Sequence, residues 1–186
     1  MKPSKELLGV LFLFLIFPKE NIEIESCSLK ISSESGTLVD TLVDQNIPDK
    51  IDIVTALHAC DTATDDAIAW AVRADAKLMM IAPCCHHDIQ SQLSETPEPW
   101  SLITRYGIMR ERLGDLLTDS LRMQILKLRG YRVEAIEFIG GEHTPRNLMI
   151  RAVKTGATID PIEVTRYEEM IAAWKVKPAL ARLLNH

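Results

Sequence analysis

The clearest pattern of apolar and polar positions lies in the middle of the chain. Two runs that are aliphatic or β-branched almost throughout, Ile51–Leu57 and Ala76–Ala82, flank a stretch, Thr64–Ala74, whose apolar residues recur at three- and four-residue spacing. Runs without alternation are typical of strands buried on both faces of a parallel sheet, and the stretch between them has helical spacing. The pattern predicts a strand–helix–strand unit with a right-handed crossover, its helix capped by Thr62 or Thr64.

A long helix is predicted after this unit. Leucines and isoleucines recur at helical spacing over Trp100–Arg129, where Gly107 and Gly114 are candidate break points. Gly130 follows at the position that a C-terminal cap requires. The polar stretch before it, Asp88–Pro99, is expected to be an exposed helix and loop.

The chain ends in two further strands and two helices. The strands are predicted at Tyr131–Ile139 and Leu148–Val153, and only the eight residues Gly140–Asn147 join them. A connection this short forces the pair to be antiparallel. Helices are predicted at Thr165–Trp174 and Pro178–Leu184.

The amino-terminal region is harder to interpret. Leu7–Phe17 is an apolar run of eleven residues that follows Lys2 and Lys5. A bilayer span needs about 20 residues, so the run is a buried strand or helix, a signal peptide or anchor, or the product of an altered start. A strand is predicted over Asn21–Ile31 and a short helix over Thr37–Val43.

Composition narrows the class of protein. The length of 186 residues suits one domain, and the net charge of −5 argues against non-specific binding to nucleic acid. The four cysteines, Cys27, Cys60, Cys84 and Cys85, do not form a spaced disulfide framework. We therefore expect a reduced, cytoplasmic protein.

Reactive side chains follow both strands of the central unit. His58, Cys60 and Asp61 follow the first strand, and the run Cys84–His87 follows the second. Parallel neighbours bring these groups to one edge of the sheet, where open α/β folds bind their ligands. Thiols and imidazoles could hold zinc, but adjacent cysteine side chains are expected to diverge, so no metal ligand is assigned.

Five sequence blocks in this order resemble a family of S-adenosylmethionine-dependent methyltransferase domains, which includes bacterial single-domain proteins and eukaryotic methyltransferase-like proteins. The blocks are ALHACDTATDDA at Ala56–Ala67, APCCH at Ala82–His86, ERLGDLLTDSLR at Glu111–Arg122, GY at Gly130-Tyr131 and EFIGGEHTPRNLMIRAVK at Glu137–Lys154. The resemblance implies an α/β fold with a Rossmann-like methyltransferase sheet that ends in an antiparallel hairpin. It divides the chain into a divergent segment 1–35, a methyltransferase-like domain 36–154 and carboxyl-terminal helices 155–186.

One feature of such domains is missing from this sequence. The family binds its cofactor with an acidic, glycine-rich loop after the first strand, and only Gly9 and Gly36 precede residue 100 here. The resemblance therefore covers the carboxyl-terminal half of the fold, as in a truncated domain. Without its usual neighbour, the strand Ile51–Leu57 would be an exposed edge. Val10–Phe17, a partner chain or a second copy could cover it, or the chain is a fragment.

The resemblance implies methyl transfer from S-adenosylmethionine to a nitrogen nucleophile of a protein or an RNA, and a chain without the glycine-rich cofactor loop would be inactive alone. The implied catalytic residues are His58, Asp61, His86 and His143. The implied cofactor-binding residues are Ala56, Leu57 and His58. The implied substrate-binding residues are Cys60, Cys85, Glu142 and Asn147.

Alternative interpretations remain for several of these groups. Asp61 would bind the acceptor's amine, accept from a backbone amide or cap the following helix. Arg112 and Arg122 would meet an anionic substrate or belong to a solvated face, Asp119 would be an ordinary helix residue, and His87 is expected to face solvent. The whole protein could instead be a non-catalytic remnant or interaction module, or a metal- or thiol-dependent protein. Membrane attachment through the apolar run is a weaker alternative.

Overall fold

A four-stranded mixed sheet organises the computed structural model, which describes residues 12–15, 26–29, 52–57, 59–93, 95–137 and 147–185. The strands lie in the order β3-β4-β6-β5. β3 and β4 are parallel, and β6 is inserted antiparallel between β4 and β5. The predicted parallel pair and the predicted antiparallel hairpin are both confirmed. The strands are β3 (Ile53–Leu57), β4 (Leu78–Ala82), β5 (Tyr131–Glu137) and β6 (Leu148–Lys154).

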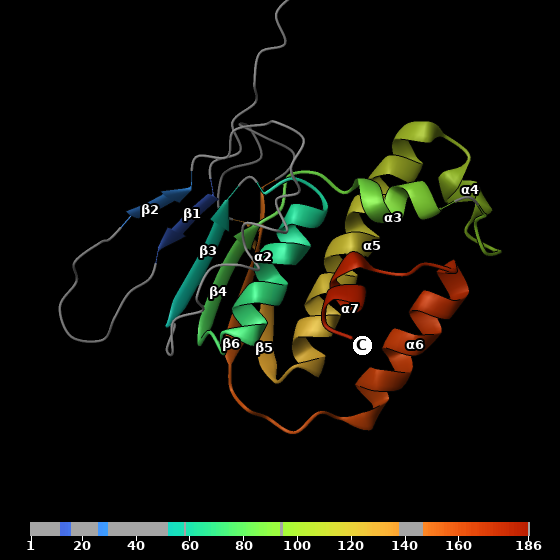
Figure 1. The fold of residues 1–186 in the computed structure, drawn as a ribbon. Coiled ribbons are helices and arrows are strands. Elements are labelled where there is room, and N and C mark those ends of the chain that lie inside the picture. The colour runs from blue at the N-terminus through green and yellow to red at the C-terminus, as the bar shows by residue number, and fades with distance from the viewer. Residues whose placement is uncertain are drawn as a thin grey trace, which may run out of the picture.

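The described helices lie on one side of this sheet (Figure 1). α2 connects β3 to β4, and the long α5 precedes β5; α7 packs on α2, and α6 packs on α5. The helices are α2 (Thr62–Arg73), α3 (His87–Gln92), α4 (Ser101–Thr104), α5 (Gly107–Leu128), α6 (Pro161–Trp174) and α7 (Ala179–Leu183).

The core lies between the helices and the sheet face that they cover. The register places Ile81 opposite Ile150 and Met79 opposite Ala152, and all four side chains are fully buried. Burial alternates along β3 and along β4 up to Ile81, so the expectation that these strands are buried on both faces is wrong for the described residues. The described helices pack on one face only, which leaves the other face half-buried.

Helix α2 begins differently from the prediction. Asp61 occupies its N-cap position with φ 50°, and no side chain caps the helix. The predicted caps, Thr62 and Thr64, are both inside the helix, where the Thr64 hydroxyl donates to the carbonyl of Ala59. The hydrogen bond from Thr64 to Ala59, rather than a side-chain cap, therefore holds the backbone at the start of α2.

The glycines of the long helix have different roles. Gly107 is the first residue of α5 and separates it from α4, as predicted, but Gly114 does not break the helix. A Cβ at Gly114 would lie 3.2 Å from the Cβ of Gln90, so this glycine lets α3 approach α5 closely. Gly130, with φ 83°, ends the helix in the predicted left-handed conformation.

The stretch after β4 is less exposed than predicted. Ile89 of α3 and Leu93 just after it are buried in the core, because α3 packs along α5. Near the chain's end, α6 starts at Pro161 rather than at the predicted Thr165, since Asp160 caps it by accepting from the amide of Ile162.

In the amino-terminal region, the structure describes two short strands. β1 (Phe12–Leu15) lies within the predicted apolar run and β2 (Ser26–Leu29) within the predicted strand, and they form an antiparallel pair. β1 lies beside β3 but belongs to a separate sheet. The helix predicted at Thr37–Val43 lies outside the described residues. In the described parts of the chain, no helix is long and apolar enough to cross a membrane.

Candidate functional site

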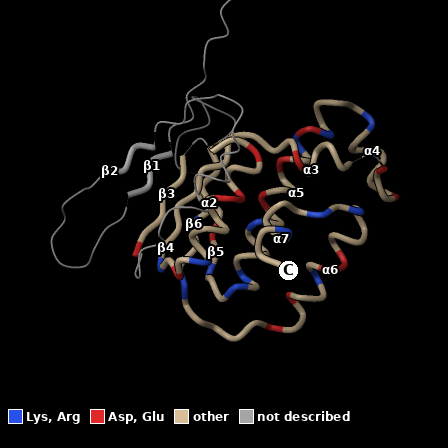
Figure 2. Tube along the Cα trace, in the orientation of Figure 1, with Lys and Arg blue, Asp and Glu red and all other residues tan. Residues whose placement is uncertain are grey.

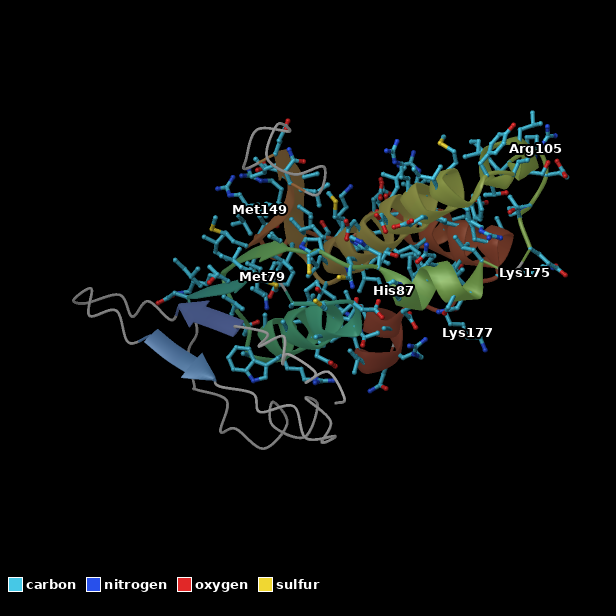
Figure 3. The ribbon with its side chains drawn as sticks, turned by 90° about the horizontal axis from the view of Figure 1, so that it is seen from above. Met79, His87, Arg105, Met149, Lys175 and Lys177 are labelled. Atoms are coloured by element: carbon cyan, nitrogen blue, oxygen red, sulfur yellow. The ribbon has the colours of Figure 1, made fainter. Side chains whose placement is uncertain are left out.

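The loops that follow β3 and β4 meet at the carboxyl edge of the sheet, which Figure 3 views from above. The amide of Asp88 donates to Asp61 Oδ1 over 2.9 Å and so joins the two loops. Of the roles predicted for Asp61, acceptance from a backbone amide is therefore confirmed. Its carboxylate accepts a hydrogen bond from the first turn of α3. The start of α2 has no side-chain cap.

Three thiols converge at this edge. Sγ of Cys84 lies 3.5 Å from Sγ of Cys60 and 3.7 Å from Sγ of Cys85, and all three atoms lie within 4.8 Å of one another. The expectation that the adjacent cysteine side chains diverge is wrong, because the loop after Pro83 turns both toward Cys60. Burial raises the pKa of Cys60, and burial with the neighbouring thiols raises the pKa of Cys84 to about 12. Both groups are therefore thiols at neutral pH.

His86 is held between two carboxylates of α5. Its Nε2 lies 2.9 Å from both Oδ1 and Oδ2 of Asp119. Its Nδ1 lies 3.2 Å from Asp115 Oδ1, but not in hydrogen-bonding geometry. The side chain is only 5% exposed, so the two aspartates determine how the imidazole is oriented. The exposed neighbour His87 faces solvent, as predicted.

A buried arginine supports this arrangement. Arg122 donates through Nε and Nη2 to the two oxygens of Asp65, over 2.9 and 2.7 Å, and through Nη1 to Asp119 over 3.2 Å. Nη2 also donates to the carbonyl of Asp61. Burial raises the pKa of Asp65 and would lower that of Arg122, but the facing carboxylates raise the pKa of Arg122 overall. The predictions of a solvated Arg122 and an ordinary Asp119 are wrong, since both are buried.

Asp65 and Asp115 are not among the candidate site residues that the sequence indicates. A signal for Asp115 exists in the sequence, because Asp115, Asp119 and Arg122 recur at four- and three-residue spacing. They form one stripe beside the core residues Leu117 and Leu121. A polar stripe adjoining the buried face of a helix is the pattern that marks these groups.

A cleft of about 770 Å³ opens along α5, and we call it the α5 cleft. His86 and Asp119 line it together with Glu111, Arg112 and Asp115. Its apolar wall is made by Pro83, Ile108, Leu116, Met123, Ala135 and Leu148. Acidic residues gather where α2, α3 and α5 approach this edge of the sheet (Figure 2). In its described lining, the cleft is thus a largely apolar groove that also carries carboxylates, an arginine and the His86 imidazole.

The remaining candidate site residues lie in different surroundings, and some of them lie outside the described residues. Ala56 is 1% exposed and packs in the core, whereas Leu57, the last residue of β3, is half-buried at the edge. Asn147 donates to Glu137 across the base of the hairpin. His58, Glu142 and His143 lie outside the described residues.

The described residues fit only part of a site for S-adenosylmethionine. The end of β3, with Leu57, could form one wall of such a site. Within the described ranges, no acidic, glycine-rich loop follows a strand.

Comparison with known proteins agrees with this fold. Neither a search of curated proteins nor a search of solved structures gave a match. Residues 19–92 match the family model of a methyltransferase domain, and this range contains β3, α2, β4 and α3. The match over residues 19–92 and the mixed sheet confirm the resemblance to a Rossmann-like methyltransferase.

Proposed function

We propose that the protein takes part in methyl transfer from S-adenosylmethionine to a nitrogen nucleophile, which the α5 cleft receives. The observation that carries this proposal is the buried His86, held by Asp119 and lining a cleft at the carboxyl edge of a methyltransferase-type sheet. This is the edge at which open α/β sheets bind their ligands.

The reaction defines what the cleft must do. The donor supplies a methyl group activated by a sulfonium. The acceptor nitrogen attacks that methyl carbon with its lone pair, the sulfur–carbon bond breaks, and the nitrogen loses a proton. Asp115 and His86 are placed to align the nitrogen and to receive its proton, and alignment with proton removal is most of the catalytic task.

The charge of the cleft favours a basic side chain of a protein as the acceptor. Among the described residues that line it, Glu111, Asp115 and Asp119 face one cation, Arg112. Carboxylates attract a lysine or arginine side chain and repel the phosphates of an RNA. The net charge of −5 on the whole chain also favours a basic protein over an RNA as the acceptor.

A second candidate is an acceptor-side module that a partner chain completes. It is favoured by the sequence, in which only Gly9 and Gly36 precede residue 100 and neither lies in an acidic, glycine-rich loop. A partner chain would then contribute the donor site. In that case the chain alone binds no donor.

The test uses the full chain and radiolabelled S-adenosylmethionine, with a mixture of unmodified basic proteins in one arm and total RNA in the other. We expect label in the protein arm, and about 100-fold less of it with Asp115→Asn or His86→Gln. Asp160→Asn, at the start of α6 and outside the cleft lining, is the matched control and should keep full activity. Label in the RNA arm alone would contradict the proposed acceptor.

Donor binding is measured separately by calorimetric titration with S-adenosylhomocysteine. Binding without label in either arm would contradict the proposed nitrogen acceptors. Absence of binding by a folded sample would favour the acceptor-side module, and absence of label after reconstitution with the donor-binding partner would contradict that module too.

A further inference from the structure

The three thiols of Cys60, Cys84 and Cys85 have no part in the proposed methyl transfer and do not line the α5 cleft. We propose that they form a binding site for a soft divalent metal ion of the zinc class. The site takes one ligand from the loop after β3 and two from the loop after β4. It is independent of the proposed function, because it rests on sulfur geometry alone.

The distances between the sulfur atoms agree with a zinc centre. Zinc binds thiolate sulfur at about 2.3 Å with tetrahedral geometry, which places neighbouring sulfurs about 3.8 Å apart. The observed separations are 3.5 Å for Cys60–Cys84 and 3.7 Å for Cys84–Cys85. The third pair lies within 4.8 Å, so a movement of about 1 Å or less completes one face of a tetrahedron.

The backbone that carries these thiols is fixed from several sides. The carbonyl of Cys60 accepts from the amide of Ala63, and the carbonyl of Asp61 accepts from Arg122. On the other loop, the contact between His86 and Asp119 follows directly after Cys85. The bond from Asp88 to Asp61 joins the two loops. The thiols are therefore preorganised, which lowers the entropy lost when a metal binds.

The chemistry of binding is balanced without any co-reactant. Each thiol loses its proton as its sulfur binds, so one Zn²⁺ releases three protons and leaves a centre with one negative charge. Three protein sulfurs leave the fourth tetrahedral position for water or another ligand, as in zinc sites with an open position. Sulfur donors select soft ions over Mg²⁺ or Ca²⁺.

The experiment titrates the reduced full chain with Zn²⁺ against a chromophoric chelator and then treats it with an alkylating reagent. We expect one Zn²⁺ per chain, and we expect mass spectrometry to show that Cys60, Cys84 and Cys85 are protected while Cys27 is not. Mg²⁺ should protect none of them. This readout uses the unaltered protein, so it does not depend on whether variants fold.

Variants then identify the ligands. Cys60→Ser, Cys84→Ser or Cys85→Ser should each weaken Zn²⁺ binding by more than about 100-fold. Losing a ligand should cost more than the typical loss from changing a group that only hydrogen-bonds to a ligand. Cys27→Ser, in β2, is the matched control and should leave binding unchanged. The proposal is overturned if folded, reduced wild-type protein retains no Zn²⁺, or if binding survives the triple serine variant.

Discussion

Arg122 on α5 and Asp65 on α2 form a two-pronged ion pair inside the protein, with N···O distances of 2.9 and 2.7 Å. Their side chains are 2% and 5% exposed. The same guanidinium donates to Asp119, which holds His86 at the α5 cleft. Arg122 therefore links α2 to α5 and also supports the orientation of the candidate catalytic imidazole.

Replacing Arg122 by methionine should destabilise the fold strongly. The variant keeps most of the side-chain volume but leaves the carboxylates of Asp65 and Asp119 buried without their cation. Removing one partner of a buried pair costs about 3–5 kcal/mol, so urea unfolding should show a loss of that size. The double variant Arg122→Met with Asp65→Asn should recover part of it, because a buried amide costs less than a buried carboxylate.

The matched control is an ion pair of similar chemistry at the surface. Arg166 donates to Glu163 along α6, and their side chains are 64% and 26% exposed. Arg166→Gln should change the free energy of unfolding much less than Arg122→Met. Equal losses in the two variants would contradict the role given to the buried pair.

The close approach of α3 to α5 can be tested at Gly114. A Cβ there would lie 3.2 Å from Gln90 Cβ and 3.4 Å from its Cα, so valine would push the two helices apart. We expect Gly114→Val to lower the free energy of unfolding by about 1–3 kcal/mol, as overpacking does. The control is Gly107→Ala, where nothing lies within 4 Å of the added carbon. It should be neutral or stabilising by up to about 1 kcal/mol in the same urea titration.

The parts of the fold that local pattern determines could be predicted from the sequence. The parallel pair β3–β4 followed from two unalternating apolar runs around a helical stretch. The β5–β6 hairpin followed from the short connection, since eight residues cannot form a parallel crossover. The match of residues 19–92 to a methyltransferase domain confirms the family resemblance on which the fold class also rested.

The parts that depend on tertiary packing could not be predicted. A charged residue on a helix is usually solvated, and only the tertiary structure, which brings Asp65 of α2 to Arg122, shows that this arginine is buried. The convergence of Cys84 and Cys85 depends on backbone angles in the loop after β4, which spacing alone does not determine. Ile89 and Leu93 are two apolar residues in a polar stretch, a signal too short to indicate that α3 packs on α5.

Tyr131 should make the stability depend on alkaline pH. Its hydroxyl donates to the carbonyl of Ala76 over 2.9 Å, and burial raises its pKa to about 12. An unfolded tyrosine titrates near 10, so the folded state favours the neutral phenol. Its contribution to stability is therefore complete below about pH 10 and is lost as the pH rises through about 12.

The measurement compares the wild type with Tyr131→Phe, because other groups also titrate in this range. The wild type should be the more stable protein below pH 10, and the difference between the two free energies of unfolding should shrink between pH 10 and about 12. The phenolate absorbance that the wild type has and the variant lacks should develop only near the upper end of that range. Development of this band near pH 10 in the folded protein would contradict the burial of the hydroxyl.

Asp160 should control the first turn of α6. Its side chain accepts from the amide of Ile162 over 3.0 Å, and Pro161 follows at the first helical position. Asp160→Ala removes the acceptor and should cost about 1 kcal/mol, whereas Asp160→Asn keeps it and should cost little. The helix is anchored further along by the buried Tyr167 and Trp174, so the loss should stay local.

Hydrogen exchange can separate a local loss from a global one. In Asp160→Ala, the amides at the start of α6 should exchange faster, while those near Trp174 should keep their protection. Gln124 of α5 donates to both the carbonyl and the carboxylate of Glu163, so the fraying should also weaken the contact between the two helices. Uniform loss of protection along α6 would mean that the cap supports the whole helix and that the buried aromatic residues do not hold it independently.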